Sequence, residues 1–192
     1  MKRLYVHRSF KDEFITALVE YAKQQKVGNG LDEDVVVGPV QNKMQFDKVR
    51  GLLDDIRSNS YKVVLGGEVD DGSNGYFVPV TIIDNPPETA RIVQEEQFSP
   101  LIPVLAYYEI DEVIERANAS EYGLGGSVWG RDTQQAIAVA NRLETGTVWV
   151  NEIHNVSVDM PFGGHKQSGL GVEHGEEGLM LFTNPKVIAI KK

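Results

Sequence analysis

The sequence predicts an α/β fold in which helices cover the faces of a β-sheet. Segments with helical periodicity alternate along the chain with short segments rich in β-branched and aromatic residues. Such alternation is typical of strand–helix–strand units, in which each helix packs on the sheet formed by its neighbouring strands. Hydrophobic residues make up 41% and charged residues 24% of the 192-residue chain. These values are ordinary for a globular protein with a single good core.

The N-terminal part begins with a predicted strand over residues 2–7, which is followed by a helix. Ser9 and Asp12 form an S-x-x-D start signal, and apolar residues at helical spacing then continue to Gln24. A second helix is predicted over residues 45–56, because its apolar residues fall on one face. That face consists of Phe46, Val49, Leu52, Leu53 and Ile56.

The remaining elements are predicted from apolar runs and the turn residues between them. A third helix opens at Asp111, and a fourth begins with Asp132 and Gln135 as its capping signal. Strands are predicted where β-branched or aromatic residues are bounded by Gly, Pro or Asn. These strands cover residues 62–65, 76–83, 101–108, 127–129, 147–151 and 186–190.

The composition excludes several classes of function. A formal net charge of −9 argues against binding to nucleic acid and to anionic membranes, because both need clustered Lys and Arg. No apolar run approaches the roughly 20 residues of a membrane helix, and the N-terminus lacks the apolar core of a signal peptide. The chain contains no cysteine, which rules out disulfides and thiolate metal sites within it. We therefore expect a cytoplasmic protein.

Three arrangements that could carry chemistry fail on spacing. Gly169-Leu170-Gly171 begins like a dinucleotide fingerprint, but a third glycine is not at the required distance and no strand precedes it. The adjacent Glu95 and Glu96 would point to opposite sides of an extended segment, unlike a glycosidase pair. A hydrolase that uses one of these carboxylates remains an alternative. No metal site is predicted, since paired spacing is missing among His7, His154, His165 and His174.

A glycine-rich stretch near the C-terminus resembles a signature of aldehyde dehydrogenases. Residues 160–171 read M-P-F-G-G-H-K-Q-S-G-L-G, which is similar to the family pattern P-F-G-G-x-K-x-S-G-x-G. The resemblance extends over nearly the whole chain. It implies a three-layer α/β/α catalytic domain, with a mostly parallel sheet and helices on both faces. On this basis residues 1–182 form a partial catalytic domain, and residues 183–192 form a C-terminal strand through which subunits associate.

Residues 95–100, E-E-Q-F-S-P, resemble the E-E-x-F-G-P element of the same family. The resemblance implies that Glu96 accepts hydrogen bonds from the nicotinamide ribose and that Phe98 lies against the nicotinamide. A carboxylate suits a vicinal diol because it can accept two charge-assisted hydrogen bonds. Ser99 departs from the family pattern, which has glycine there. Without the resemblance, a solvated turn before a strand is the alternative interpretation.

Four further positions take roles from the resemblance. Gln45 and Lys48 match residues that approach the cofactor riboses and pyrophosphate, although a plain polar helix face is an equal alternative. Asn151 ends the strand before the substrate-facing loop, and Phe162 matches an aromatic residue at the aldehyde entrance. Phe162 is equally well explained as a core anchor for the glycine-rich stretch. Val172 replaces an arginine found in many family members.

The family attacks its aldehyde with a cysteine thiolate, and this chain has no cysteine. By resemblance, the chain begins a short way downstream of that nucleophile, and the general-base glutamate and phosphate-binding region also precede it. We therefore predict no catalytic residue here, and expect part of an NAD- or NADP-dependent aldehyde dehydrogenase that is inactive alone. A non-catalytic truncated paralogue that serves as an oligomerisation module is the alternative. A homodimer or larger homo-oligomer is expected, with a small aldehyde as substrate only in a complete enzyme.

Overall fold

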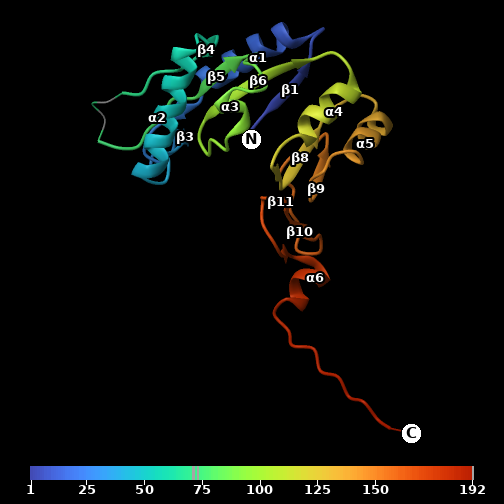
Figure 1. Cartoon of the computed structure of the whole chain (residues 1–192). Coiled ribbons are helices and arrows are strands. Elements are labelled where there is room, and N and C mark those ends of the chain that lie inside the picture. Colours follow the sequence, from blue (N-terminus) through green and yellow to red (C-terminus); the bar gives the residue numbers. More distant parts are fainter. Residues whose placement is uncertain (71, 73, 192) are drawn as a thin grey trace. The chain divides into compact units, whose positions relative to one another are not determined.

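The computed structural model describes residues 1–70, 72 and 74–191, and the chain divides into two compact units. Unit 1 runs from Met1 to Glu109 and unit 2 from Ile110 to Lys192. Both lie mostly within the single domain predicted over residues 1–182, and that boundary stays a prediction. The elements of unit 1 are β1 (Leu4–His7), α1 (Lys11–Lys23), β2 (Lys26–Val27), β3 (Val35–Val37), α2 (Lys43–Ser58), β4 (Val63–Leu65), β5 (Thr81–Asp84), α3 (Arg91–Gln94) and β6 (Leu101–Tyr107) (Figure 1).

Unit 1 is built on a four-stranded sheet in the order β1–β6–β5–β4. The strand β6 pairs in parallel with both β1 and β5, and β4 runs antiparallel to β5 at the edge. Consecutive residues of a strand face opposite sides of the sheet. Ile82 and Val104 accordingly pack in the cluster that contains the apolar face of α1, whereas Ile83 and Leu105 pack in the cluster formed with α2 and α3. The predicted mostly parallel sheet with helices on both faces is confirmed in this unit.

The helix α2 shows why the sequence prediction worked best there. The side chain of Asn42 caps it by accepting a 2.9 Å hydrogen bond from the backbone N–H of Gln45. The predicted apolar face packs on the sheet, with Phe46 only partly buried at its margin. Burial of such side chains supplies most of the stability of a helix of this length. The fully buried residues are Val49, Leu52, Leu53 and Ile56.

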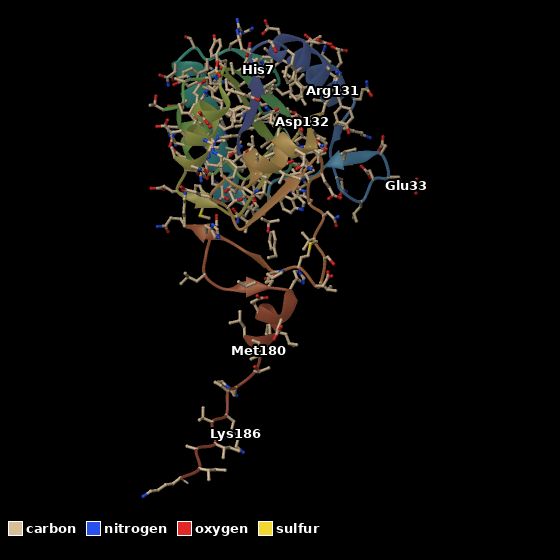
Figure 2. All side chains as sticks on the ribbon, turned by 90° about the vertical axis from the view of Figure 1, so that its right-hand side faces the viewer. His7, Glu33, Arg131, Asp132, Met180 and Lys186 are labelled. Atoms are coloured by element: carbon tan, nitrogen blue, oxygen red, sulfur yellow. The ribbon has the colours of Figure 1, made fainter. Side chains whose placement is uncertain are left out.

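Unit 2 has its own small parallel pair of strands. The strands β8 and β9 pair in register, and α5 packs on both of them. Asp132 caps α5, because its carboxylate accepts a 3.0 Å hydrogen bond from the N–H of Gln135, as the sequence predicts (Figure 2 labels Asp132). The elements are α4 (Ile110–Asn118), β7 (Tyr122–Gly123), β8 (Gly125–Val128), α5 (Thr133–Ala140), β9 (Thr147–Val150), β10 (Phe162–Gly163), β11 (His165–Lys166), β12 (Val172–Glu173) and α6 (Gly175–Met180).

Several predicted boundaries are wrong. The helix α1 begins at Lys11 with Phe10 at its N-cap, and the hydroxyl of Ser9 instead lies 2.7 Å from Nδ1 of His7. The strand predicted over residues 76–83 begins later than expected, at Thr81, and runs to Asp84, because Pro79 lacks the N–H that a ladder needs. The short elements β2, β3 and α3 were not predicted, since two to four residues carry too little periodicity.

The central strand β6 contains Pro103, an unusual position for a residue that cannot donate to a ladder. The register pairs Leu4 with Val104, and the N–H of Arg8 bonds to the carbonyl of Tyr107. Continued toward the N-terminus, this parallel pattern directs the missing N–H of Pro103 at the carbonyl of Lys2. The strand β1 therefore begins at Leu4 and not at residue 2, where the sequence predicts it.

The strand predicted over residues 186–190 is absent from the chain by itself. Residues 184–191 form neither helix nor strand, and Lys192 lies outside the described residues. Figure 2 labels Met180 at the end of α6 and Lys186 in the extended stretch that follows. A strand needs a neighbour for its backbone hydrogen bonds. The role of residues 183–192 in association therefore stays a prediction.

A buried ion pair joins α1 to the end of β5. The Lys11 ammonium donates to the carboxylate of Asp84, and their side chains are only 4% and 7% exposed. Lys62 donates to the other carboxylate oxygen at 2.7 Å but is 70% exposed. Burial by itself raises the pKa of Asp84, yet the hydrogen bonds from Lys11 and Lys62 outweigh it and hold the pKa below its ordinary value of 3.8.

We expect Asp84→Asn to lower the free energy of unfolding by about 3–5 kcal/mol, because it removes the buried counterion of Lys11 and leaves only the exposed carboxylate of Asp12, 3.2 Å away. Lys62→Ala, which removes the exposed partner, should cost less than about 1 kcal/mol. A carboxyl with a lowered pKa stabilises the fold above its ordinary pKa and loses this effect as pH falls through the lowered one. The free energy of unfolding, measured by urea titration, should therefore decrease below about pH 4 more for the wild type than for Asp84→Asn. An equal loss of unfolding free energy in Asp84→Asn and Lys62→Ala would contradict the assignment of Asp84 as the buried partner of Lys11.

Candidate functional site

The loop between α3 and β6, residues 95–99, carries two of the predicted cofactor residues. Its side chains alternate: Glu96 is exposed, Gln97 is 2% exposed and Phe98 is 68% exposed. The residue in the middle of the loop is thus buried, while the residues on either side of it are exposed to solvent. The loop thus exposes a carboxylate and an aromatic ring to solvent.

The backbone of this loop is locally strained. Phe98 has a φ of 39°, in the left-handed region that a residue with a Cβ atom seldom adopts. Strain of this kind persists when surrounding contacts hold the backbone in place. Ser99, which departs from the family glycine, does not have a positive φ, so its conformation does not require glycine. Its hydroxyl is buried without a hydrogen-bond partner among the described residues.

The helix α2 supplies the other two predicted cofactor residues, and both bond to the same loop. The amide of Gln45, which is 8% exposed, donates to the carbonyl of Gln97 at 2.6 Å. The ammonium of Lys48 donates to the carbonyl of Glu96 at 2.7 Å. The structure therefore brings Gln45, Lys48, Glu96 and Phe98 together. Their contact with a cofactor stays a prediction, and in the chain alone Gln45 and Lys48 serve to hold the loop.

Sequence reasoning missed Lys2, which contacts the end of α3 and the start of this loop. Its ammonium donates to the carbonyls of Val93, Gln94 and Glu95, the last two at 2.7 and 3.1 Å. These carbonyls end α3 and have no partners within that short helix. Burial, reinforced by the charge of Arg3, lowers the pKa of Lys2 from 10.5 to about 8. A lysine near the N-terminus gives no motif by which the sequence could have indicated this contact.

The two adjacent glutamates do not form a hydrolase pair. Nε of Arg91 lies 2.6 Å from the carboxylate of Glu95, and this hydrogen bond is the main reason that the pKa of Glu95 lies below its ordinary value of 4.5. A glycosidase acid needs a raised pKa so that it can donate a proton near neutral pH. Glu95 is instead held ionised beside α3. The alternative of a carboxylate-based hydrolase gains no support.

Asn151 lies at the exit of β9 with a positive φ of 56°. Its amide pairs with the peptide of Gly130: the oxygen accepts from the Gly130 N–H at 2.8 Å and the nitrogen donates to the Gly130 carbonyl at 2.9 Å. The indole N–H of Trp149 bonds to the carbonyl of Asn155 at 2.8 Å and fixes the next turn. Phe162 is half-buried in β10, opposite Glu173 of β12. Both substrate-pocket assignments stay predictions.

The glycine-rich stretch owes its composition to close backbone packing. A Cβ atom on Gly146 would collide with the carbonyl oxygen of Gly163, and one on Gly163 would lie 2.8 Å from the carbonyl oxygen of Gly171. Lys166 links this stretch to two other segments of the unit, because its ammonium donates to the carbonyl of Asn118 at 2.7 Å and pairs with Glu144 at 2.7 Å. The glycines of the stretch that resembles a family motif thus allow close backbone packing in this unit.

The comparisons with known proteins agree with the sequence resemblance. The model of the aldehyde dehydrogenase family matches residues 1–188. The chain belongs to the aldehyde dehydrogenase family. A mitochondrial aldehyde dehydrogenase of Leishmania tarentolae is 42% identical over 186 residues, which are 97% of this chain and 37% of that protein. Cytosolic aldehyde dehydrogenase 1 of Rattus norvegicus is 41% identical over 189 residues, which are 98% and 38% of the two chains.

Solved aldehyde dehydrogenase structures share the fold. Betaine aldehyde dehydrogenase from Staphylococcus aureus, in a complex with NAD+, matches with a TM-score of 0.89 at 37% identity over all of this chain and 40% of its own. The chain therefore spans less than half of the length of these aldehyde dehydrogenases. Two observations concern the described residues alone: no helix is long and apolar enough to cross a membrane, and no three His, Asp or Glu side chains gather as metal ligands would.

Proposed function

We propose that this chain is the C-terminal part of an NAD- or NADP-dependent enzyme that oxidises aldehydes to carboxylic acids. The observation that carries the proposal is the loop of residues 95–99, in a chain of the aldehyde dehydrogenase family. It exposes both Glu96 and Phe98 while burying the residue between them. We also propose a cytoplasmic location, although the relatives include one named cytosolic and one named mitochondrial.

The exposed residues of this loop suit the nicotinamide end of a dinucleotide. A carboxylate such as Glu96 can accept hydrogen bonds from both hydroxyls of a ribose, and the ring of Phe98 offers a flat apolar face to a nicotinamide. When bound, the cofactor supplies the acceptor for the hydride that leaves the aldehyde. The chain itself orients the ribose and the ring, and Asn151 and Phe162 belong to the aldehyde side in this proposal.

The chain contains no cysteine, so it lacks the thiol with which this family attacks an aldehyde. We expect a purified sample to show no NAD- or NADP-dependent oxidation of aldehydes. The measurement follows the absorbance of the reduced nicotinamide with several aldehydes, on protein whose intact mass confirms this chain alone. A curated full-length relative serves as the positive control. Turnover well above a blank would overturn this part of the proposal.

The affinity for the cofactor should be low. Much of the binding energy of a dinucleotide comes from phosphate contacts at a helix N-terminus that follows a glycine-rich turn, and this sequence has no such fingerprint. We expect NAD+ to bind with a Kd of about 1 mM or weaker. Isothermal calorimetry or ligand-observed NMR measures this value. Micromolar affinity would contradict the proposal that this chain, through Glu96 and Phe98, binds only the nicotinamide end of the cofactor.

One observation favours the second candidate function, an oligomerisation module. The C-terminal stretch exposes Phe182, Val187, Ile188 and Ile190, each at least 75% accessible. Contiguous exposed apolar side chains usually mark a surface that another chain covers. We propose that residues 183–192 pair with a neighbouring subunit, most simply in a two-fold dimer. This association is compatible with the enzymatic proposal and does not require catalysis.

Deleting residues 186–192 should shift the protein toward monomer or toward aggregation. Sedimentation velocity on the full chain and on the deletion measures the change. Val187→Lys with Ile190→Lys, which keeps the length of the segment, is the matched variant and should weaken association in the same way. A monomeric full chain whose sedimentation is unchanged by both variants would rule out the proposed interface.

A further inference from the structure

Gln97 is the most deeply buried polar residue of the proposed cofactor loop. Its side-chain nitrogen donates to the carbonyls of Leu101 and Lys2 at 2.9 and 3.0 Å, with the carbonyl of Met1 at 3.3 Å. Its side-chain oxygen is buried without a partner among the described residues. A buried carbonyl oxygen without a donor costs free energy, so the stabilising contribution of this side chain comes from the hydrogen bonds of its amide nitrogen.

The amide of Gln97 replaces a hydrogen bond that the sheet cannot make. Pro103 has no N–H to give to the carbonyl of Lys2, at the point where the β1–β6 ladder would otherwise continue. The side-chain nitrogen of Gln97 reaches that carbonyl instead. It also bonds to Leu101, the first residue of β6, and so ties the loop to both strands.

We propose that Gln97 is a positioning residue for the nicotinamide end of the cofactor. Its buried amide anchors the middle of the loop, so that Glu96 and Phe98 are turned outward before a ligand arrives. The inference rests on the proposed function for the identity of the ligand, but the ordering of the loop can be measured without one.

The contacts around Gln97 explain why one side chain can have this effect. Bonds from Gln45 and Lys48 of α2 hold the carbonyls of residues 97 and 96, and the Gln97 amide ties the loop to the carbonyls of Lys2 and Leu101. Phe98 keeps a left-handed backbone only while these contacts persist. When the amide is lost, the loop samples other conformations, and the apparent Kd rises as the competent fraction falls.

The test uses the full chain and nicotinamide mononucleotide, which contains the ribose and ring assigned to this loop. Gln97→Met keeps the volume of the side chain but removes its donors, and Gln97→Glu places acceptors opposite carbonyls. Gln94→Met is the matched control, because the side chain of Gln94 is exposed and donates to the carbonyl of Glu88 at 2.6 Å, outside the loop of residues 95–99. Backbone order parameters from ¹⁵N relaxation and the Kd from NMR shift changes are measured for each protein.

For the wild type and Gln94→Met we expect rigid amides at residues 96–98, with order parameters of about 0.85. In Gln97→Met these values should fall below about 0.6, and the Kd for the mononucleotide should rise about fivefold or more. Gln97→Glu should have the larger effect. A merely stabilising role would lower the free energy of unfolding but leave the Kd and loop order of the folded protein unchanged.

The outcomes separate this inference from the proposed function. If Gln97→Met keeps the order parameters and the Kd of the wild type, the positioning role is wrong while the nicotinamide site stands. If the wild-type chain shows no shifts at Glu96 and Phe98 but Gln97→Met still loosens the loop, the ligand is wrong and the anchoring stands. A wild-type loop that is already mobile overturns the inference, even when the Gln97 variants do not fold.

Discussion

The in-register pairing of β6 with β1 and β5 is the constraint on which the rest of unit 1 depends. Both faces of this sheet are buried, so a shift of one residue would exchange Val104 and Leu105 between the cluster on α1 and the cluster on α2 and α3. The same register sets residues 1–3 beside the start of β6. The loop before β6 therefore meets the N-terminal residues, and Lys2 and Gln97 can form their contacts across it.

The sequence predicted the elements whose periodicity is long and undisturbed. The apolar face of α2 and the cap of α5 by Asp132 depend on local spacing, and both are confirmed. The strand over residues 186–190 failed for a different reason, because its apolar residues satisfy a strand pattern but no neighbouring strand is present. The start of β1 failed because Pro103, a hundred residues away, removes the donor that would extend it. Non-local causes of this kind leave no trace in a local window.

The residues of the candidate site also differ in how well the sequence predicted them. The resemblance found Glu96 and Phe98 because their types and spacing match a family element, whereas Gln97 occupies the variable position between them. Nothing in the sequence distinguishes a glutamine that bonds to three carbonyls from a glutamine in solvent. The glycine-rich stretch behaves in the opposite way. It was the signature most useful for recognising the family, yet its Gly163, like Gly146, serves to let backbone segments pack closely together.

The proline in the central strand makes positions 97 and 103 epistatic. Any residue other than proline at 103 would bring an N–H that could bond to the carbonyl of Lys2, so this one contact of the Gln97 amide would no longer be needed by the ladder. While proline remains, loss of that amide removes a hydrogen bond that the backbone of residue 103 cannot restore. The order in which the two positions change during divergence therefore matters, since one sequence of substitutions passes through a state that lacks the hydrogen bond to Lys2 and the other does not.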